Sequence, residues 1–303
     1  MLPLVEIPDI VQHYAPFFTS VFSPQAFHQF QRYLSGLIVS ENKTVDGINR
    51  LFVLDTRNQS SLNRLLTESP FDIKALHQAR LALLQSLPGT QMKSKGVLSI
   101  DDTLLSHYGQ HFDKIAYLYD SAQECYVWAH NLVNLHYSDD LTDYPIDFCL
   151  WQPADLDVIE TGLRAAGIRI RPSKYELKHR DSKKWRQYLL GLWRRHQHKP
   201  EVGKLYQSKL ILAQQLISEF VAGHRGVHLP VTFDNWSTQP AFCRFLDKTL
   251  KIPYVGTLAS DDLLILKTGQ QRLDAFDDHL KKEHQQSTQF GGNPIFGKLS
   301  ITY

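Results

Sequence analysis

Two short apolar runs of this chain end in acidic residues of the kind that hold divalent metal ions. The run 97–100 is followed by Asp101 and Asp102, and the run 229–233 is followed by Asp234. Mg²⁺ prefers hard oxygen ligands and usually takes only one or two protein carboxylates. A structural alternative stays open, because an Asp at a strand end can also cap a turn or bind a backbone N–H. The order of the surrounding elements bears on this choice.

Three strand-like runs and a helix-like segment precede Asp234. The runs 114–119 and 125–137 are rich in Val, Tyr, Trp and Leu, which is strand composition. The long run 125–137 is partly apolar on both faces, which predicts an interior strand. A three-strand meander, a helix and a fourth strand ending in Asp is the order of the ribonuclease H-like core. The first and fourth strands of that core are neighbours, so we expect Asp101 and Asp234 to meet at adjacent strand ends.

Five segments together resemble the DDE transposases of bacterial insertion sequences, and the resemblance covers roughly residues 33 to 254. They are Ile100-Asp101-Asp102-Thr103, the block 126–133 (Tyr-Val-Trp-Ala-His-Asn-Leu-Val), the block 144–148 (Tyr-Pro-Ile-Asp-Phe), the helix 204–220, and Thr232-Phe233-Asp234-Asn235-Trp236. By this resemblance Asp101 matches the first catalytic Asp of the family and Asp234 the second. Asp102 is the less favoured member of its pair.

The resemblance implies an α/β protein, with a ribonuclease H-like mixed sheet flanked by helices and an all-α N-terminal domain. The implied activity is that of a transposase, which cleaves and joins DNA strands by phosphoryl transfer that depends on Mg²⁺ or Mn²⁺. The expected partner is double-stranded DNA at the element ends, with a homodimer on DNA as an open assembly. Two alternatives remain: a ribonuclease H-like nuclease that only cuts, and a non-catalytic DNA-binding remnant of a transposase.

The third catalytic acid of the family has no clear counterpart in this chain. The family places a Glu in a pattern of Tyr, Arg three residues later, Glu four further on and Lys seven beyond that. No such pattern occurs from Asp234 to Tyr303, and Glu283 is the only glutamate after Asp234. We therefore expect the chain to stop before the helix with the third acid, and to neither nick nor join DNA by itself.

Helical patterns fill residues 1–95, which we interpret as a separate N-terminal domain. Apolar residues recur at helical spacing after Ser23-Pro24 and in the segments 44–54, 61–66 and 72–87. This domain is either a structural cap or a DNA-end-binding domain, and the resemblance favours the second. Residues 96–303 are then the ribonuclease H-like catalytic domain, incomplete at its C-terminus. Further helices are predicted at 155–167, 202–222 and 240–250, and a fifth strand at 254–258.

A strongly basic helical segment spans residues 164–209. It contains fourteen Lys and Arg against three acidic residues, in a chain whose net charge is only +2. Such a concentration indicates a surface that faces DNA phosphates, although a solvated basic helix is the structural alternative. The apolar residues at 185, 188, 189, 192 and 193 share one helical stripe, which we expect to pack inward. The predicted DNA-binding residues are Lys178, Arg180, Lys183, Lys184, Arg186, Arg194 and Arg195.

The composition argues against membrane and disulfide-rich classes. No apolar run approaches the length of a membrane span, and the N-terminus lacks the pattern of a signal peptide. The three cysteines, Cys125, Cys149 and Cys243, have no metal-ligand spacing and are typical of core thiols in a reducing compartment. The histidines form no zinc pattern. We expect a cytoplasmic, nucleoid-associated protein.

Overall fold

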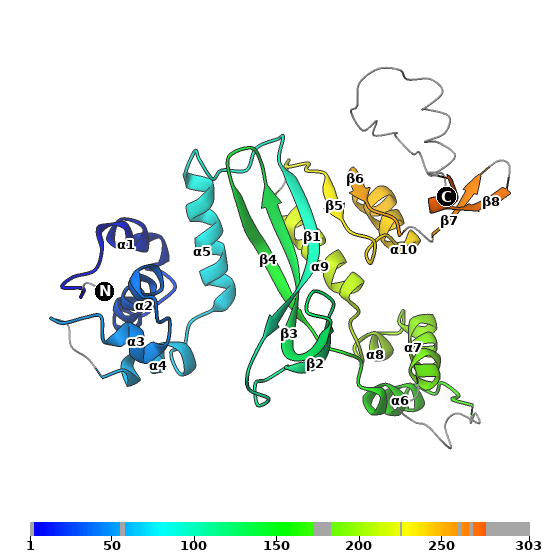
Figure 1. Cartoon of the computed structure of the whole chain (residues 1–303), viewed down its shortest axis with the longest axis horizontal. Coiled ribbons are helices and arrows are strands. Elements are labelled where there is room, and N and C mark those ends of the chain that lie inside the picture. The colour runs from blue at the N-terminus through cyan, green and yellow to red at the C-terminus, as the bar shows by residue number, and fades with distance from the viewer. Residues whose placement is uncertain are drawn as a thin grey trace. The chain divides into compact units, whose positions relative to one another are not determined.

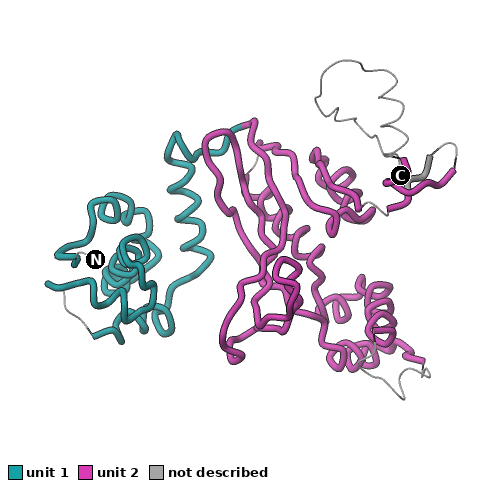
Figure 2. Tube along the Cα trace, viewed as in Figure 1, with its two compact units in different colours: residues 1–93 teal, residues 94–303 magenta. Residues whose placement is uncertain are grey.

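The chain divides into two compact units, Met1–Lys93 and Ser94–Tyr303, which are coloured separately in Figure 2. The computed structural model describes residues 3–54, 58–171, 183–224, 226–259, 262–266 and 269–276. Within these ranges, every helix is too short or too polar to cross a membrane. Each unit has its own core and is described by itself.

The smaller unit is helical. Its elements are α1 Asp9–Tyr14, the 3₁₀ turn η1 Ala15–Phe18, α2 Pro24–Val39, α3 Val45–Asn49, α4 Ser60–Thr67 and α5 Ile73–Ser86. The four predicted helices are present, and Ser23 caps α2 by accepting a hydrogen bond from the backbone N–H of Ala26. The prediction missed α1 and η1. It also made the second helix too long, because the chain leaves α3 after Asn49 and Phe52 pairs with Leu4 in an isolated bridge.

A buried arginine joins the helices of this unit. Arg32 is fully buried and donates hydrogen bonds to Gln29 at 2.9 Å and to Asn49 at 3.1 Å. Its guanidinium also lies 4.8 Å from the centre of the Phe52 ring. A buried charge with these partners fixes α2 against the end of α3 and the segment that follows it, since the loss of a partner would leave the buried charge without compensation.

The larger unit is built on a mixed sheet (Figure 1). Its strands are β1 Val97–Ser106, β2 Ala116–Asp120, β3 Cys125–Ser138, β4 Asp143–Trp151, β5 Val231–Phe233 and β6 Tyr254–Gly256. β3 is antiparallel to β1 on one edge and to β2 and β4 on the other, while β1, β5 and β6 run parallel. The predicted adjacency of the first strand and the strand before Asp234 is confirmed, as is the interior position of β3.

Two details of the sheet differ from the prediction. β1 continues to Ser106, paired with β3 along its whole length, so Asp101 and Asp102 lie inside a strand and not at its tip. A strand was also missed, because β4 contains Pro145, which argues against a strand interior. The sheet tolerates this proline because β4 pairs, among the described strands, on one side only, and the pairing register shifts beside it, between Leu135 and His136.

One face of the sheet is covered by α9 Lys209–Gly223, which packs against β3 and β4. Alternate residues of β3 are buried on this face, as the two-residue period of a strand requires: Ala129, Asn131, Val133, Leu135 and Tyr137. The predicted helix 202–222 is in fact two helices, α8 Pro200–Gly203 and α9. The break occurs because Ser208 acts as an N-cap, its hydroxyl accepting from the N–H of Ile211 at 3.3 Å.

A helical segment between β4 and α9 has a core of its own. It consists of α6 Leu156–Ala165, α7 Lys183–His196 and α8, and its buried residues include Ile159, Leu163, Trp185, Leu189 and Trp193. The inward packing predicted for the apolar stripe of α7 is confirmed. After β5 come α10 Pro240–Arg244, the π-helical turn η2 Phe245–Leu250, and a two-stranded sheet of β7 Leu263–Leu266 and β8 Gly269–Arg272.

Candidate active site

Asp101 and Asp234 occupy equivalent positions on two neighbouring parallel strands. The β1–β5 ladder ends at the pair Ile100 and Phe233; Asp101 is the next residue of β1, and Asp234 is the first residue after β5. Neighbouring strands are about 4.8 Å apart, so the pairing places the two residues side by side. Both are solvent-exposed. The structure thus brings together the two residues that the sequence predicted as metal ligands.

The electrostatics of Asp234 reflect this proximity. Partial burial and then the negative charge of Asp101 raise the pKa of Asp234, with a smaller contribution of the same sign from Asp102. The hydrogen bonds that its carboxylate receives from the backbone of Trp236 and Ser237 act in the opposite sense. Two negatively charged carboxylates placed this close together form a site whose repulsion a divalent cation would relieve.

The turn after β5 holds Asp234 in place. Its carboxylate accepts a hydrogen bond from the N–H of Trp236 at 3.2 Å, and its carbonyl accepts one from the hydroxyl of Thr238 at 3.0 Å. The same hydroxyl also lies within hydrogen-bond distance of the carbonyl of Thr257, which follows β6, so its one proton is shared between the two carbonyls. Phe233 is buried and packs on Phe242 and Tyr254. The carboxylate is therefore fixed by the turn and by the core beneath it.

Asp102 points away from this pair. It lies on the α9 face of β1, since side chains alternate along a strand and the preceding buried residue on its face is Ile100. Its Oδ2 accepts hydrogen bonds from Asn131 at 2.9 Å and from Lys209 at 2.6 Å. On the other face, Thr103 accepts a hydrogen bond from Asn134 at 3.2 Å, next to Asp101.

Lys209 belongs to the site, although the sequence reasoning counted it only as the last residue of the basic segment. Its ammonium contacts Asp102 and lies 4.9 Å from the ring centre of Trp151 and 5.8 Å from that of Trp236. Trp151 in turn donates from Nε1 to the hydroxyl of Tyr206 at 3.2 Å. The one sequence signal for this role was the Ser-Lys pair at a helix start, which does not identify a distant partner.

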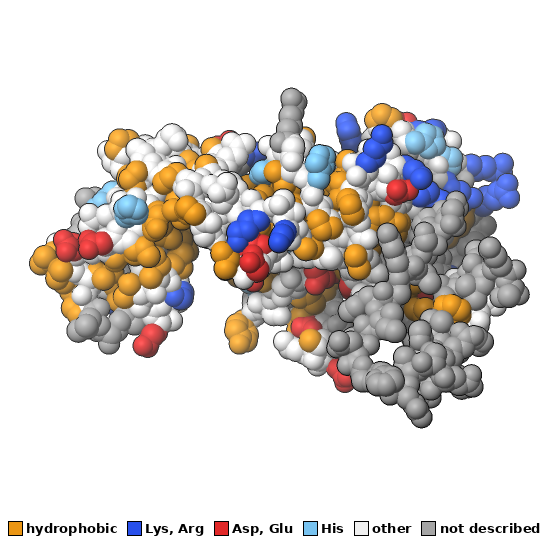
Figure 3. Space-filling model, turned by 90° about the horizontal axis from the view of Figure 1, so that it is seen from above, with side chains coloured by type: hydrophobic (Ala, Val, Ile, Leu, Met, Phe, Trp, Pro, Cys, Tyr) orange, Lys and Arg blue, Asp and Glu red, His pale blue; other side chains and the backbone are white. Residues whose placement is uncertain are grey.

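The basic helix α7 lies within electrostatic reach of this cluster. Burial raises the pKa of Tyr206, while the hydrogen bond with Trp151 and the charges of Arg186 and Arg194 lower it. Four of the predicted DNA-binding residues are exposed: Lys183, Lys184, Arg194 and Arg195. Figure 3 shows Lys and Arg side chains gathered toward the right of that view. Lys178, Arg180 and Glu283 lie outside the described residues.

The donor set at Asp101 and Asp234 fits a hard divalent cation such as Mg²⁺ or Mn²⁺. Carboxylate oxygens are the preferred ligands of these ions, and one or two protein carboxylates with phosphate and water are usual for Mg²⁺. In the part of the chain that the structure describes, no group of three or more His, Cys, Asp or Glu residues could hold a metal ion. At the end of the β1–β5 ladder the described residues bring two carboxylates together, those of Asp101 and Asp234.

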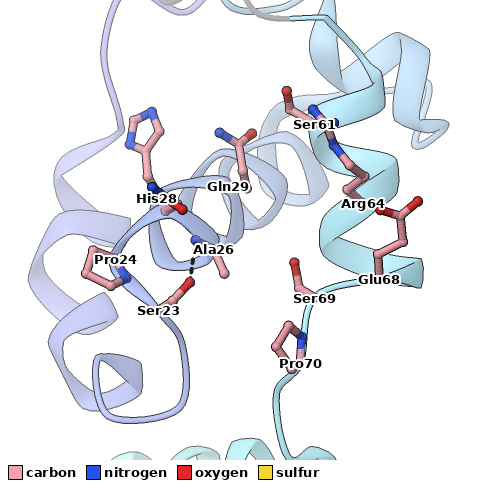
Figure 4. A pocket seen from close by; sticks show the side chains of 11 residues that line it. Ser23, Pro24, Ala26, His28, Gln29, Ser61, Arg64, Glu68, Ser69 and Pro70 are labelled. Carbon is pink, nitrogen blue, oxygen red and sulfur yellow. Dashed lines mark hydrogen bonds between the residues drawn. The ribbon is translucent and has the colours of Figure 1, made fainter.

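A cavity of about 730 Å³ lies in the smaller unit (Figure 4). It is lined from α2 and α4, and by the residues that follow α4, with mostly polar side chains that include Gln25, Ser61, Arg64 and Glu68. None of the predicted site residues lines it, and Glu68 is its one acidic lining residue. It does not share the chemistry of the carboxylate pair.

Comparison with known proteins identifies one protein family. Residues 16–267 match the family described as DDE superfamily endonuclease, so the match covers most of the chain. No curated protein matches. Among solved structures, a piggyBac transposase synaptic complex with hairpin DNA is similar at 13% identity and a TM-score of 0.36, over 86% of this chain. The match covers only 45% of that transposase chain, and the likeness is too low to support an argument.

Proposed function

Because the chain belongs to the DDE superfamily of endonucleases, we propose that it is a DNA transposase whose metal site is formed by Asp101 and Asp234. The observation that carries the proposal is the position of these two carboxylates, side by side at the end of the β1–β5 ladder. Endonucleases of this superfamily generally depend on divalent metal ions. The chemistry is phosphoryl transfer on DNA, with cleavage and joining of strands.

Asp101 and Asp234 hold the metal ions in this proposal. When bound, Mg²⁺ or Mn²⁺ supplies the positive charge that stabilises the attacking and leaving oxygens of an in-line displacement. The turn at Trp236 and Thr238 keeps the Asp234 carboxylate oriented, and the long β1–β3 ladder keeps Asp101 in place. Glu283 is the only glutamate that follows Asp234, and since its sequence context does not match the family pattern, its role as a third acid is left to the test below.

DNA binding is assigned to two parts of the chain. The exposed basic residues of α7 are the proposed contacts to the phosphate backbone, and Arg186 and Arg194 already lie within electrostatic reach of Tyr206. Residues 1–95 are proposed as the domain that recognises the element ends, and residues 96–303 as the catalytic domain. The same proposal includes a homodimer on DNA, in which each copy of the chain would bind one of the two element ends.

The test is whether metal binding and DNA binding depend on each other. A metal ion held by Asp101 and Asp234 can also bind a phosphate oxygen, so Mg²⁺ should raise the affinity of the chain for DNA. This gain should disappear in Asp101→Asn and in Asp234→Asn. It should remain in Asp247→Asn, which changes an exposed aspartate on η2. A DNA affinity that does not change with Mg²⁺ would overturn the proposal, and so would an Mg²⁺-dependent gain in affinity that remains in both Asp101→Asn and Asp234→Asn.

The products formed with Mn²⁺ extend the same test. Cut and joined strands that depend on Asp101, Asp234 and Glu283 would identify Glu283 as the third acid. Strands that are cut but never joined would identify a nuclease. Metal-dependent binding without any product would mean that this chain binds DNA but does not turn it over, as expected from the missing Tyr, Arg, Glu, Lys pattern.

A further inference from the structure

Two adjacent aspartates of β1 have different surroundings, and this difference concerns the choice of metal ligand. Asp101 lies on the open side of the strand, beside Asp234. Asp102 lies on the α9 side, where its Oδ2 accepts from both Asn131 and Lys209. Asn131 is only 3% exposed and the Lys209 contact is 2.6 Å long, so Asp102 is held in a partly buried, charge-neutralised network.

The Lys209 ammonium is itself fixed from several directions. Lys209 is the first residue of α9, immediately after the N-cap Ser208, so the start of the helix sets its position. The rings of Trp151 and Trp236 lie 4.9 Å and 5.8 Å from its Nζ, and both faces attract a cation. Its side chain is 26% exposed and that of Asp102 is 19% exposed, so the ion pair is screened less than one at the surface.

We propose that Lys209 is a positioning residue that occupies Asp102 and so leaves Asp101 as the partner of Asp234 in the metal site. The inference rests on the proposed function. A metal ion would have to displace a tethered ammonium to bind Asp102, whereas the Asp101 carboxylate accepts, among the described residues, a single hydrogen bond, from the backbone N–H of Asp102. The neutralised Asp102 also adds less negative charge to a site where two carboxylates already repel each other.

Binding of Mn²⁺ to the full chain without DNA tests this inference, with free Mn²⁺ followed by electron paramagnetic resonance. Asp101→Asn and Asp234→Asn should each weaken Mn²⁺ binding by about tenfold or more, since each removes one of two carboxylate ligands. Asp102→Asn should bind Mn²⁺ within about twofold of the unmodified chain. Lys209→Arg keeps the positive charge and should also leave Mn²⁺ binding unchanged.

The decisive variant combines Lys209→Ala with Asp101→Asn. In the part of the chain that the structure describes, the β1–β5 ladder ends at Ile100 and Phe233, so the edge of β1 beside Asp102 carries no further β5 pairing. Loss of the ammonium would let the Asp102 side chain turn across this edge toward Asp234, and the double variant should then regain much of the Mn²⁺ affinity that Asp101→Asn alone loses. A purely structural role for Lys209 predicts no recovery, and no recovery in a double variant with a native near-ultraviolet spectrum would overturn the inference. If Lys209→Ala does not fold, the single variant Asp102→Asn decides: a loss equal to that of Asp101→Asn overturns the inference.

Failure of the inference and failure of the proposed function give different results. If Asp101→Asn and Asp234→Asn both bind Mn²⁺ as the unmodified chain does, the metal site itself is wrong. If they lose binding and Asp102→Asn loses it equally, the metal site stands and only the role of Lys209 is refuted.

Discussion

Replacing Asp234 by Asn should raise the stability of the metal-free protein at neutral pH. The two carboxylates follow a paired position of neighbouring parallel strands, which places them about 6 Å apart. At that distance two unit charges repel by about 0.7 kcal/mol in bulk water and by about 2.8 kcal/mol at an effective dielectric constant of 20. Because both side chains are exposed, we expect a value near the lower end, about 1 kcal/mol at low ionic strength.

The pH dependence of this gain follows from the raised pKa of Asp234. A carboxyl group whose pKa is raised by folding costs stability when it is ionised, so the unmodified protein regains that stability as the pH falls. The difference in the free energy of unfolding between Asp234→Asn and the unmodified protein therefore has its largest value at pH 7. It should shrink as the pH falls through the raised pKa and vanish below the ordinary value of 3.8. Salt at 0.15 M should reduce it to about half, because the Debye length is then about 8 Å.

Urea unfolding followed by tryptophan fluorescence measures this effect in the larger unit, because all five tryptophans lie at or beyond residue 128. A double-mutant cycle of Asp101→Asn and Asp234→Asn should give a coupling of about 1 kcal/mol, and Mg²⁺ should stabilise only the unmodified protein. A coupling of zero would refute the proximity of the two carboxylates. So would a larger coupling of Asp234 with Asp102 than with Asp101.

Three further outcomes are expected. Neutralising the basic residues of α7 should lower the slope of log affinity against log salt by about 0.9 for each lost contact to duplex DNA, and an unchanged slope would mean that they do not face phosphates. The residues to change are Lys183, Lys184, Arg186, Arg194 and Arg195. Gly36→Ala should destabilise the smaller unit by about 1–3 kcal/mol, because the added Cβ would lie 2.2 Å from a side-chain carbon of Ile48. Gly191→Ala, at a helical glycine with open space around it, should stabilise the protein by up to about 1 kcal/mol. Thermal melting followed by circular dichroism measures both effects, and equal changes in the two variants would contradict the prediction. Burial, Asp147 and Glu219 raise the pKa of the Cys149 thiol to about 11, so a thiol reagent at pH 8 should modify exposed Cys125 well before Cys149, and the reverse order in mass spectra would contradict this.

The part of the fold that local patterns specify was predictable. Strand composition located β1, β2, β3 and β5, and the order of elements predicted that β1 and β5 are neighbours. The stripe of α7 predicted which of its side chains are buried, because a helix packed on one face must place apolar residues at its own period.

What could not be predicted depends on contacts distant in sequence. The two acidic residues Asp101 and Asp102 predicted that the strand ends there, but β1 continues to Ser106 because it pairs with β3 along that length. The proline of β4, Pro145, is disfavoured inside a strand by local rules, and its place at the sheet edge makes that strand possible. Lys209 is 107 residues from Asp102, and no periodicity or motif connects two such positions.

Metal-directed cleavage of the polypeptide tests the central claim most directly. Fe²⁺ replaces Mg²⁺ at carboxylate sites, and with ascorbate and peroxide it generates radicals that cut the nearby backbone. Mass spectrometry of the fragments should show cuts close to Asp101 in β1 and close to Asp234 after β5, competed by Mg²⁺ and lost in Asp101→Asn and Asp234→Asn. Cuts at other places in the chain, or cuts at these two places that persist in both variants, would contradict a shared metal site.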